Sequence, residues 1–275
     1  MNFVLEHPLV RSLTPFLVVT EANRGGVNSA PFGLTVTPGN VIDPNRMQNE
    51  PFCALLQNLD ARTFGPEGMP MDRWVFYDCC FMPGAIFGFG RPAAEVPDAT
   101  RAILGVPDDY VGVVPYSMYI AIPMAEPGSW MGHNLASIAP MLPHEALKGL
   151  GTLTKSIAIR SFGVQHFYGA TQWDSSALHV HVKFGPLVLV TAYTPAHSES
   201  KTLTYAFAVT DDALLGAMGA PDVAFDRAPA DIWIHPEDTA SMVGLQSRIE
   251  SGDRFVIPFA PRGDGAVPVA LRRPE

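Results

Sequence analysis

The arrangement of apolar and polar positions is clearest between residues 146 and 162. Leu153, Ile157 and Ile159 stand at the even spacing of a β-strand, and Lys155 falls in the same register. In a strand, its ammonium group would lie among those three apolar side chains. Because burial disfavours the charged form of an amine, such a lysine would have a lowered pKa and could act as a nucleophile towards carbonyl compounds. The alternative is an ordinary lysine whose stem packs while its head reaches water.

The rest of the pattern predicts short strands joined by turns, with few helices. Prolines (26) and glycines (24) are spread along the chain, which favours β over α structure. Strands are expected at residues 74–81, 86–89, 110–123, 165–172, 177–184, 187–194, 202–210, 232–234 and 255–259. Short helices are expected at residues 97–104, from near 143, and from 211 or 212 to before 219. The predicted fold class is mainly β, within the α+β group.

The chain contains no internal repeat and no clear linker. Residues 1–70 are rich in turns and carry no recognisable chemistry. We expect them to pack on the main domain or to form an oligomer contact, and residues 71–275 to form that main domain.

Composition narrows the classes of function. Hydrophobic residues make up 47% of the 275 residues and charged residues 16%, which suggests further apolar area buried in a homo-oligomer. The net charge of −9 argues against nucleic acid and anionic membrane surfaces as partners. No apolar run reaches transmembrane length, and the three cysteines form neither a disulfide framework nor a zinc spacing. We therefore expect a cytoplasmic protein without a cofactor.

A second chemical pattern lies in residues 178–184. In a strand, His179, His181 and Lys183 would share one face. A His-x-His pair is a metal-ligand spacing, and His197 could supply a third ligand, although no carboxylate stands between His181 and His197. A metal-dependent β-barrel enzyme is therefore one alternative function. The other interpretation is a polar strand face towards solvent or a wet barrel interior.

Arg91 ends the apolar run 86–90 and precedes Pro92. A guanidinium group at such a place would suit a carboxylate, which it can hold with two parallel hydrogen bonds. A surface arginine at a strand end is the alternative. No dinucleotide fingerprint or nucleophile elbow stands at a strand-to-helix turn.

Several of these segments, in this order, resemble the acetoacetate decarboxylase family. The run that ends at Arg91 and residues 97–107, Pro-Asp-Ala-Thr-Arg-Ala-Ile-Leu-Gly-Val-Pro, resemble the family's early strand and the short helix that a proline turn closes. Residues 149–157 resemble the passage that carries the Schiff-base lysine, and Lys155 falls on that lysine. Residues 183–194 are similar to the strand, glycine turn and strand that come next.

The resemblance implies an antiparallel β-barrel or cone-like sheet with a few flanking short helices. It also implies a lyase in which Lys155 forms an iminium with a substrate ketone and Arg91 holds the substrate carboxylate. Tyr116, Tyr119 and His133 would be acid/base or positioning groups. Further substrate contacts are expected from Ser156, His179, His181 and Lys183.

Two positions depart from the family's pattern. Ser156 stands where the decarboxylases carry a second lysine, and Tyr116, Ser117 and Tyr119 stand where a glutamate is expected. The sequence therefore favours an aldol, dehydration or cyclisation step on a small keto acid or its aldol adduct over simple decarboxylation. A non-catalytic barrel that binds a small molecule is the further alternative.

Overall fold

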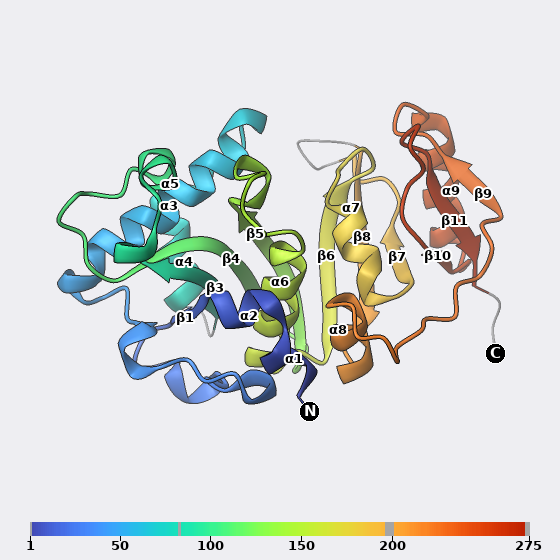
Figure 1. The fold of residues 1–275 in the computed structure, drawn as a ribbon. Helices are drawn as coiled ribbons and strands as arrows, with labels where there is room; N and C mark the ends of the chain where they lie inside the picture. Colours follow the sequence, from blue (N-terminus) through green and yellow to red (C-terminus); the bar gives the residue numbers. More distant parts are fainter. Residues whose placement is uncertain (1, 82–83, 196–200, 273–275) are drawn as a thin grey trace. The chain divides into compact units, whose positions relative to one another are not determined.

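The computed structural model describes residues 2–81, 84–195 and 201–272. Their contacts divide them into two compact units, which are described separately (Figure 1). Unit 1 lies within residues 1–128 and 133–164, and unit 2 within residues 129–132 and 165–275. Strand β5, Ser129–Ser137, therefore gives its first four residues to unit 2 and the others to unit 1.

Unit 1 is built on a sheet with the strand order β2-β1-β3-β4-β5. Its other strands are β1 (Thr14–Val18), β2 (Val41–Ile42), β3 (Ala85–Pro92) and β4 (Val113–Pro123). Strand β3 is antiparallel to both β1 and β4, whereas β2 runs parallel to β1 (Figure 1). A β-bulge in the β3–β4 ladder leaves Tyr116 without a register partner, because Phe89 pairs with Ser117 and Gly90 with Pro115.

Helices α3 (Glu50–Phe64) and α6 (Leu150–Ser161) cover opposite faces of this sheet. On α3, Phe52 packs edge-on against Phe16 of β1 at 5.0 Å between ring centres. Phe16 pairs with Gly88, and Gly88 pairs with Met118, so these three residues share a face. The next residue, Ser117, points the other way and contacts Thr154 of α6. The sheet of unit 1 is thus buried on both faces.

The remaining helices of unit 1 are short. Helix α5 confirms the helix predicted at residues 97–104, and Gly105 ends it in the left-handed conformation at φ 64°. Across the described ranges, no helix has the length and apolar character that a membrane crossing requires. The elements are α1 (Phe3–Glu6), α2 (Pro8–Ser12), α4 (Arg73–Phe81) and α5 (Asp98–Leu104), with 3-10 turns η1 (Arg24–Gly26), η2 (Pro31–Gly33), η3 (Pro38–Asn40), η4 (Met47–Asn49), η5 (Gly65–Glu67), η6 (Ala93–Glu95) and η7 (Ala139–Met141).

Unit 2 has the strand order β6-β8-β7-β10-β11-β9, and residues 129–132 of β5 run parallel to β6. The ladders between β6 and β8, β8 and β7, β7 and β10, β10 and β11, and β11 and β9 are antiparallel. The elements are β6 (His166–Gln172), α7 (Leu178–His181), η8 (Val182–Phe184), β7 (Leu187–Thr191), β8 (Thr202–Ala208), α8 (Asp211–Ala217), β9 (Ile232–Ile234), α9 (Thr239–Glu250), β10 (Phe255–Ile257) and β11 (Val267–Leu271). The strands predicted after residue 185 and the helix predicted from residue 211 are confirmed.

The predicted antiparallel barrel or cone is wrong. In the described residues each unit carries an open row of strands, with β2 at the edge of one row and β9 at the edge of the other. Three predicted strands are also helices, since residues 74–81 fall in α4, residues 150–161 form α6, and residues 178–184 form α7 and η8. All three segments are short and contain apolar residues at spacings that also fit a strand, and periodicity alone does not separate a buried strand from a buried helix.

Residues 1–70 supply β1, β2 and α3 to unit 1. Their expected packing on the main domain or role in an oligomer contact stays a prediction. The fold places this segment beside the strands β3 and β4, which follow it in the sequence.

A substitution at Gly88 tests how closely β1, β3 and β4 pack. A Cβ atom at this position would overlap the carbonyl oxygen of Ser117 and the ring of Phe16. We therefore expect Gly88→Ala to lower the free energy of unfolding by about 2–4 kcal/mol in denaturant titrations. Gly25→Ala is the control, because a Cβ atom there meets nothing within 4 Å. Equal stability of the two variants would contradict this packing.

Candidate functional site

The amino-terminal end of α6 is the part of unit 1 best suited to hold an anion. Gly149 precedes the helix at φ 91°, and Lys148 and Gly149 are exposed. The N–H groups of a first helical turn have no acceptor four residues earlier in the helix, and the helix dipole adds partial positive charge there. A phosphate group is the ligand that such a helix end accommodates most readily.

Gly151, in the first turn of α6, has neither a conformational nor a packing reason to be glycine. Its φ angle lies outside the left-handed region, and a Cβ atom would meet only side-chain carbons of Leu135, at 3.7 Å or more. Glycine within a helix costs about 1 kcal/mol relative to alanine. Glycine here keeps the first turn of the helix without a methyl group next to Leu135. Gly149 does leave open space, but its positive φ alone accounts for glycine.

Strand β5 precedes this helix end, and a connection that contains η7 joins the two. Its ladder with β6 extends from Ser129 to Gly132 and goes no further. In unit 1, residues 133–137 are the last strand of the row, next to β4. Among the described residues of that unit, one edge of this segment has no strand partner. The N–H and C=O groups of an open edge can pair with an extended, amide-bearing ligand as they would with another strand.

The connection from β5 to α6 is anchored to the sheet through Glu145. Its carboxylate lies 3.0 Å from Nη1 of Arg91 and accepts a hydrogen bond of 3.3 Å from the Thr100 hydroxyl. The Arg91 guanidinium also lies 5.3 Å from the ring centre of Tyr116. Burial, followed by the Glu145 carboxylate, raises the pKa of Tyr116. Arg91 and Tyr116 are thus brought together, and Arg91 is already paired with a carboxylate of its own chain.

Lys155 lies in the middle of α6 with none of its surface exposed. Its Nζ is 5.9 Å from the ring centre of Tyr119 on β4. Burial lowers the pKa of Lys155 well below its ordinary value and raises the pKa of Tyr119. Ser156 is buried as well, and its hydroxyl donates a hydrogen bond of 2.9 Å to the carbonyl oxygen of Thr152. Of the two interpretations of Lys155, the structure agrees with the buried one, but the segment around it is a helix and not a strand.

His133 is exposed on β5, and its neighbour Asn134 connects that strand to α3. The Asn134 amide donates a hydrogen bond of 2.5 Å to Asp60, whose second oxygen accepts one of 2.6 Å from the Met71 N–H. Desolvation by the surrounding chain lowers the pKa of His133, and the Asp60 carboxylate opposes this shift. His133 is therefore a neutral imidazole at pH 7, able to accept a proton.

The proposed histidine metal site is not supported. His179 and His181 lie on α7, where residues two positions apart do not face each other. His179 is exposed, whereas His181 is buried with its ring 5.0 Å from that of Tyr205. His197 lies outside the described residues. Within the described ranges, no three His, Cys, Asp or Glu side chains could hold a metal ion. Lys183 follows in η8 and is exposed.

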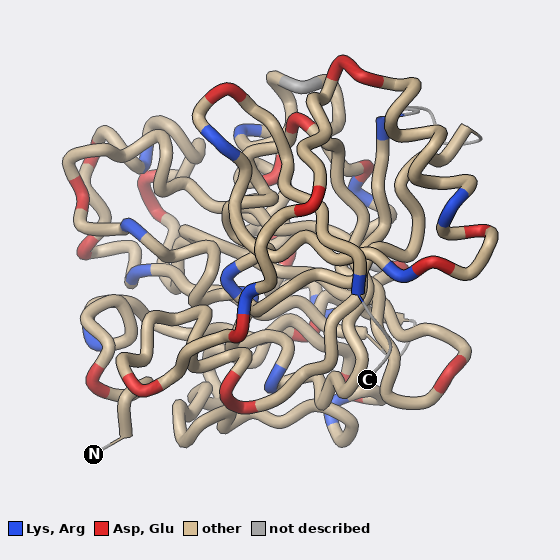
Figure 2. Tube along the Cα trace, turned by 90° about the vertical axis from the view of Figure 1, so that its right-hand side faces the viewer, with Lys and Arg blue, Asp and Glu red and all other residues tan. Residues whose placement is uncertain are grey.

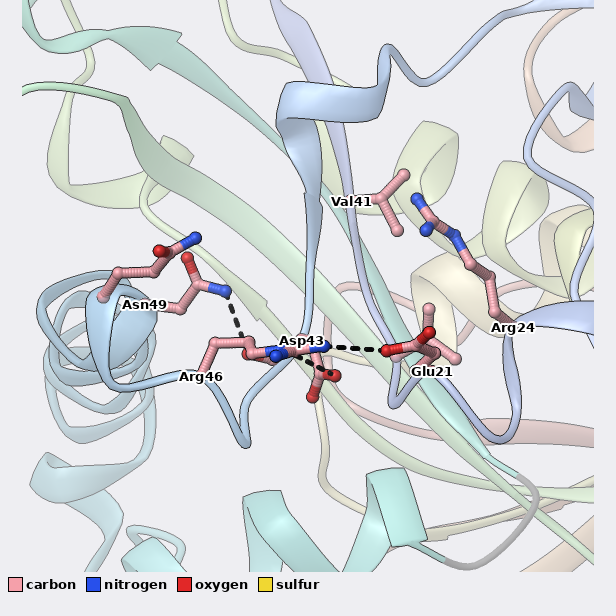
Figure 3. Close-up of a pocket in the computed structure, with 8 residues that line it drawn as sticks. Glu21, Arg24, Val41, Asp43, Arg46 and Asn49 are labelled. Atoms are coloured by element: carbon pink, nitrogen blue, oxygen red, sulfur yellow. Dashed lines mark hydrogen bonds and ion pairs between the residues drawn. The ribbon is translucent and has the colours of Figure 1, made fainter.

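A polar pocket of about 180 Å³ lies elsewhere in unit 1 (Figure 3). Arg46 contacts Glu21 at 2.8 Å and Asp43 at 3.8 Å, so its charge is compensated within the pocket wall. These side chains are largely exposed, apart from Asp43, and exposed ion pairs of this kind contribute little to binding or stability.

Charged residues give no further site. Figure 2 shows acidic and basic residues interspersed along the trace rather than gathered by sign. A protein that binds nucleic acid through its phosphates usually carries a basic patch. The absence of nucleic acid among the partners stays a prediction.

No family model and no curated protein sequence matches the chain. Similar solved structures include a chain of the NatC complex bound to Gag peptide and CoA, with 14% identity, coverage of 61% of this chain and 97% of that chain, and a TM-score of 0.42. Aminoglycoside 6'-acetyltransferase type Ii has 14% identity, coverage of 60% and 95%, and a TM-score of 0.40. The ribosomal-protein-S18-alanine N-acetyltransferase from Escherichia coli has 10% identity, coverage of 57% and 88%, and a TM-score of 0.36. These values are too low to establish the fold or activity of this chain.

The resemblance to acetoacetate decarboxylases is wrong. The closed barrel that the resemblance implies is replaced, in the described residues, by open rows of strands. Lys155 is enclosed in a helix, where no carbonyl substrate can reach its amine without unfolding the core. The Schiff-base lyase and its keto-acid substrate are therefore overturned. The two alternative functions, a metal-dependent barrel enzyme and a non-catalytic binding barrel, are overturned as well, because both require a closed barrel.

The helix end at residues 148–151 was not among the sites expected from the sequence. The signal was present as Lys-Gly-Leu-Gly, two glycines around one apolar residue, between a strand and an apolar run. The run that follows was interpreted as a strand. Without a helix there, no phosphate-binding helix end was expected at these glycines.

Lys155→Met tests the burial of the amine. The folded state holds this lysine with a lowered pKa, so the unfolded state binds more protons between that lowered pKa and the ordinary value of 10.5. Wild-type stability should therefore rise with pH over this range, and the variant should lose that rise. At pH 7 we expect Lys155→Met to raise the free energy of unfolding by about 1–3 kcal/mol, measured by denaturant titration.

The exposed Lys148 provides the matched control, since Lys148→Met should change stability by less than about 0.5 kcal/mol. A Lys155→Met protein less stable than the wild type at pH 7 would show that the amine is stabilised in place rather than penalised by burial.

Proposed function

We propose that the chain is an acyltransferase that takes its acyl group from an acyl-CoA and transfers it to an amine. The observation that supports this is the amino-terminal end of α6, where Gly149 leaves open space and a Cβ atom at Gly151 would make ordinary contact with Leu135 only. The proposal rests on this geometry and not on the likeness to acetyltransferase structures.

Two adjacent features favour CoA over a simple phosphate ligand. The helix end offers N–H groups near Gly149 and Gly151, with Lys148 exposed beside them, and these suit a pyrophosphate. Residues 133–137 offer an open strand edge in unit 1, which suits a chain with successive amides. CoA carries both a pyrophosphate and a pantetheine arm with two amides. The open space at Gly149 fits the group, because a Cβ atom there would meet nothing within 4 Å.

His133 is the side chain best placed on β5 to move a proton. When bound, an acyl-CoA supplies an acyl group activated as a thioester. The acceptor amine loses a proton as the C–N bond forms, and the neutral imidazole of His133 accepts it. The imidazolium then returns the proton to the thiolate that leaves as the C–S bond breaks. Tyr116 and Tyr119 are buried, and burial raises the pKa of both phenols, so neither supplies a phenolate at neutral pH.

Gly151→Ala separates binding from folding. Alanine fits the helix and should leave the protein as stable or more stable, by up to about 1 kcal/mol. Its methyl group occupies the space beside the N–H groups, so the affinity for CoA should fall about tenfold, or about 1.4 kcal/mol, in isothermal titration calorimetry. Gly244→Ala in α9 is the control, because this helical glycine belongs to unit 2 and a Cβ atom there meets nothing within 4 Å. Equal CoA affinity for Gly151→Ala and the wild type would exclude this helix end as the binding site.

His133→Gln tests the proton acceptor. With acetyl-CoA and a panel of primary amines, thiol release should fall about 10²–10⁴-fold while CoA affinity stays unchanged. The pKa of His133 is lowered from its ordinary 6.5. Wild-type kcat/KM should therefore be constant near pH 7 and should fall only when the pH drops below 6.5, where His133 begins to be protonated. An unchanged acid limb in the variant would show that another group accepts the proton.

A further inference from the structure

Asp60, on α3, is an acidic side chain with none of its surface exposed. Among the described residues, no lysine or arginine forms an ion pair with it. A carboxylate taken out of water without a cation beside it costs several kcal/mol, and an uncharged side chain of similar size would avoid that cost. A charge kept in such a place therefore points to a use for it.

The hydrogen bonds of Asp60 favour its ionised form. The side-chain amide of Asn134 donates to one carboxylate oxygen at 2.5 Å, and the backbone N–H of Met71 donates to the other at 2.6 Å. A protonated carboxyl group would direct its O–H towards one of these donors, whereas a carboxylate accepts from both. Burial raises the pKa of Asp60, and the two hydrogen bonds oppose that shift.

Asn134 links this charge to the strand that carries His133. Side chains alternate along β5, so Asn134 faces α3, whereas its neighbours His133 and Leu135 face the other way. On that other face Leu135 lies next to the first turn of α6, since a Cβ atom at Gly151 would be 3.7 Å from it. His133 is therefore on the face of the sheet that α6 covers, and Asp60 lies behind the strand.

The charge of Asp60 acts on His133 across this strand. Burial lowers the pKa of His133, and the Asp60 carboxylate opposes that shift. The other charged side chains on the elements around β5 are exposed, paired with another side chain or enclosed in α6, and they are Glu50, Arg62, Arg91, Glu145, Lys155 and Arg160.

We propose that Asp60 is a positioning residue for His133: its carboxylate holds Asn134 and stabilises the imidazolium that forms when His133 accepts the proton of the acceptor amine. This inference rests on the acyl transfer proposed above. As the C–N bond forms, the amine proton moves to the imidazole, and the new positive charge lies in front of a fixed negative charge. Attraction between charges is stronger in a buried environment than in water. Asp60 itself neither contacts the substrate nor exchanges a proton.

Asp60→Asn tests this role with a side chain of nearly the same size. Loss of the negative charge should lower the pKa of His133, so its imidazole Hε1 signal, assigned with His133→Gln, should titrate at lower pH in NMR spectra of the full chain. The kcat with acetyl-CoA should fall about tenfold while the KM for acetyl-CoA stays unchanged, and the acid limb of kcat/KM should move to lower pH.

Asp72→Asn is the matched control, because it removes the same charge from an exposed carboxylate next to Met71 and should change none of these values. A fall in kcat without any change in the titration of His133 would show a merely structural role for Asp60 and would overturn the inference.

A measurement on the wild type applies even if Asp60→Asn does not fold. With ¹³C-labelled aspartate, the carboxyl signal of Asp60 should shift as His133 titrates, and this shift should be absent in His133→Gln. An Asp60 signal that does not respond to His133 would also overturn the inference. A wild type in which the two residues respond to each other, but which transfers no acyl group, would instead contradict the proposed acyl transfer.

Discussion

The packing of α6 against β4 is the constraint on which unit 1 depends. The Ser117 hydroxyl on β4 donates a hydrogen bond of 2.6 Å to Thr154, which in turn donates to the carbonyl oxygen of Leu150 at 2.8 Å. Both hydroxyls are fully buried, so loss of either partner would leave a polar group unsatisfied in the core. This pair fixes the rotation of the helix and, with it, the direction in which the N–H groups of its first turn point.

The same helix carries two opposite kinds of local environment. Its middle is buried on all sides. This burial lowers the pKa of Lys155 and keeps its amine out of contact with solvent. Its amino-terminal end is open, because Gly149 and Gly151 carry no side chains and the preceding Lys148 extends into solvent. A rigid helix with an open end can bind a phosphate without reorganising the fold. Glu145, held by Arg91, fixes the connection that precedes it.

The sequence predicted the elements that alternate cleanly or carry clear end signals. Residues 97–104 were predicted as a helix because Asp98 begins it and Gly105 ends it, and the structure agrees. The strands within 86–92 and 113–123 and those of unit 2 after residue 185 were also predicted. These segments have one interpretation each, since their apolar runs are bounded by glycine, proline or charged residues.

The candidate site was not predicted, for a physical reason. Helix α6 is buried around most of its circumference, so polar residues such as Thr152 and Ser156 lie in the core and do not mark a solvent face. Its Thr and Ile residues are also typical of strands. Lys155, an ionisable residue in an apolar run, then suggested chemistry that its burial in a helix rules out. Residues 178–181 show the same ambiguity. In the predicted strand His179 and His181 share a face, whereas in helix α7 they point in different directions.

The most direct test of this account is an amide chemical-shift titration of the ¹⁵N-labelled protein with CoA. We predict that the largest shifts fall on the backbone N–H groups of Gly149 and Gly151, accompanied by those of residues 133–137. Saturable shifts at these positions would establish the helix end and the strand edge as one binding site. Shifts confined to other parts of the chain, or none at millimolar CoA, would contradict the central claim.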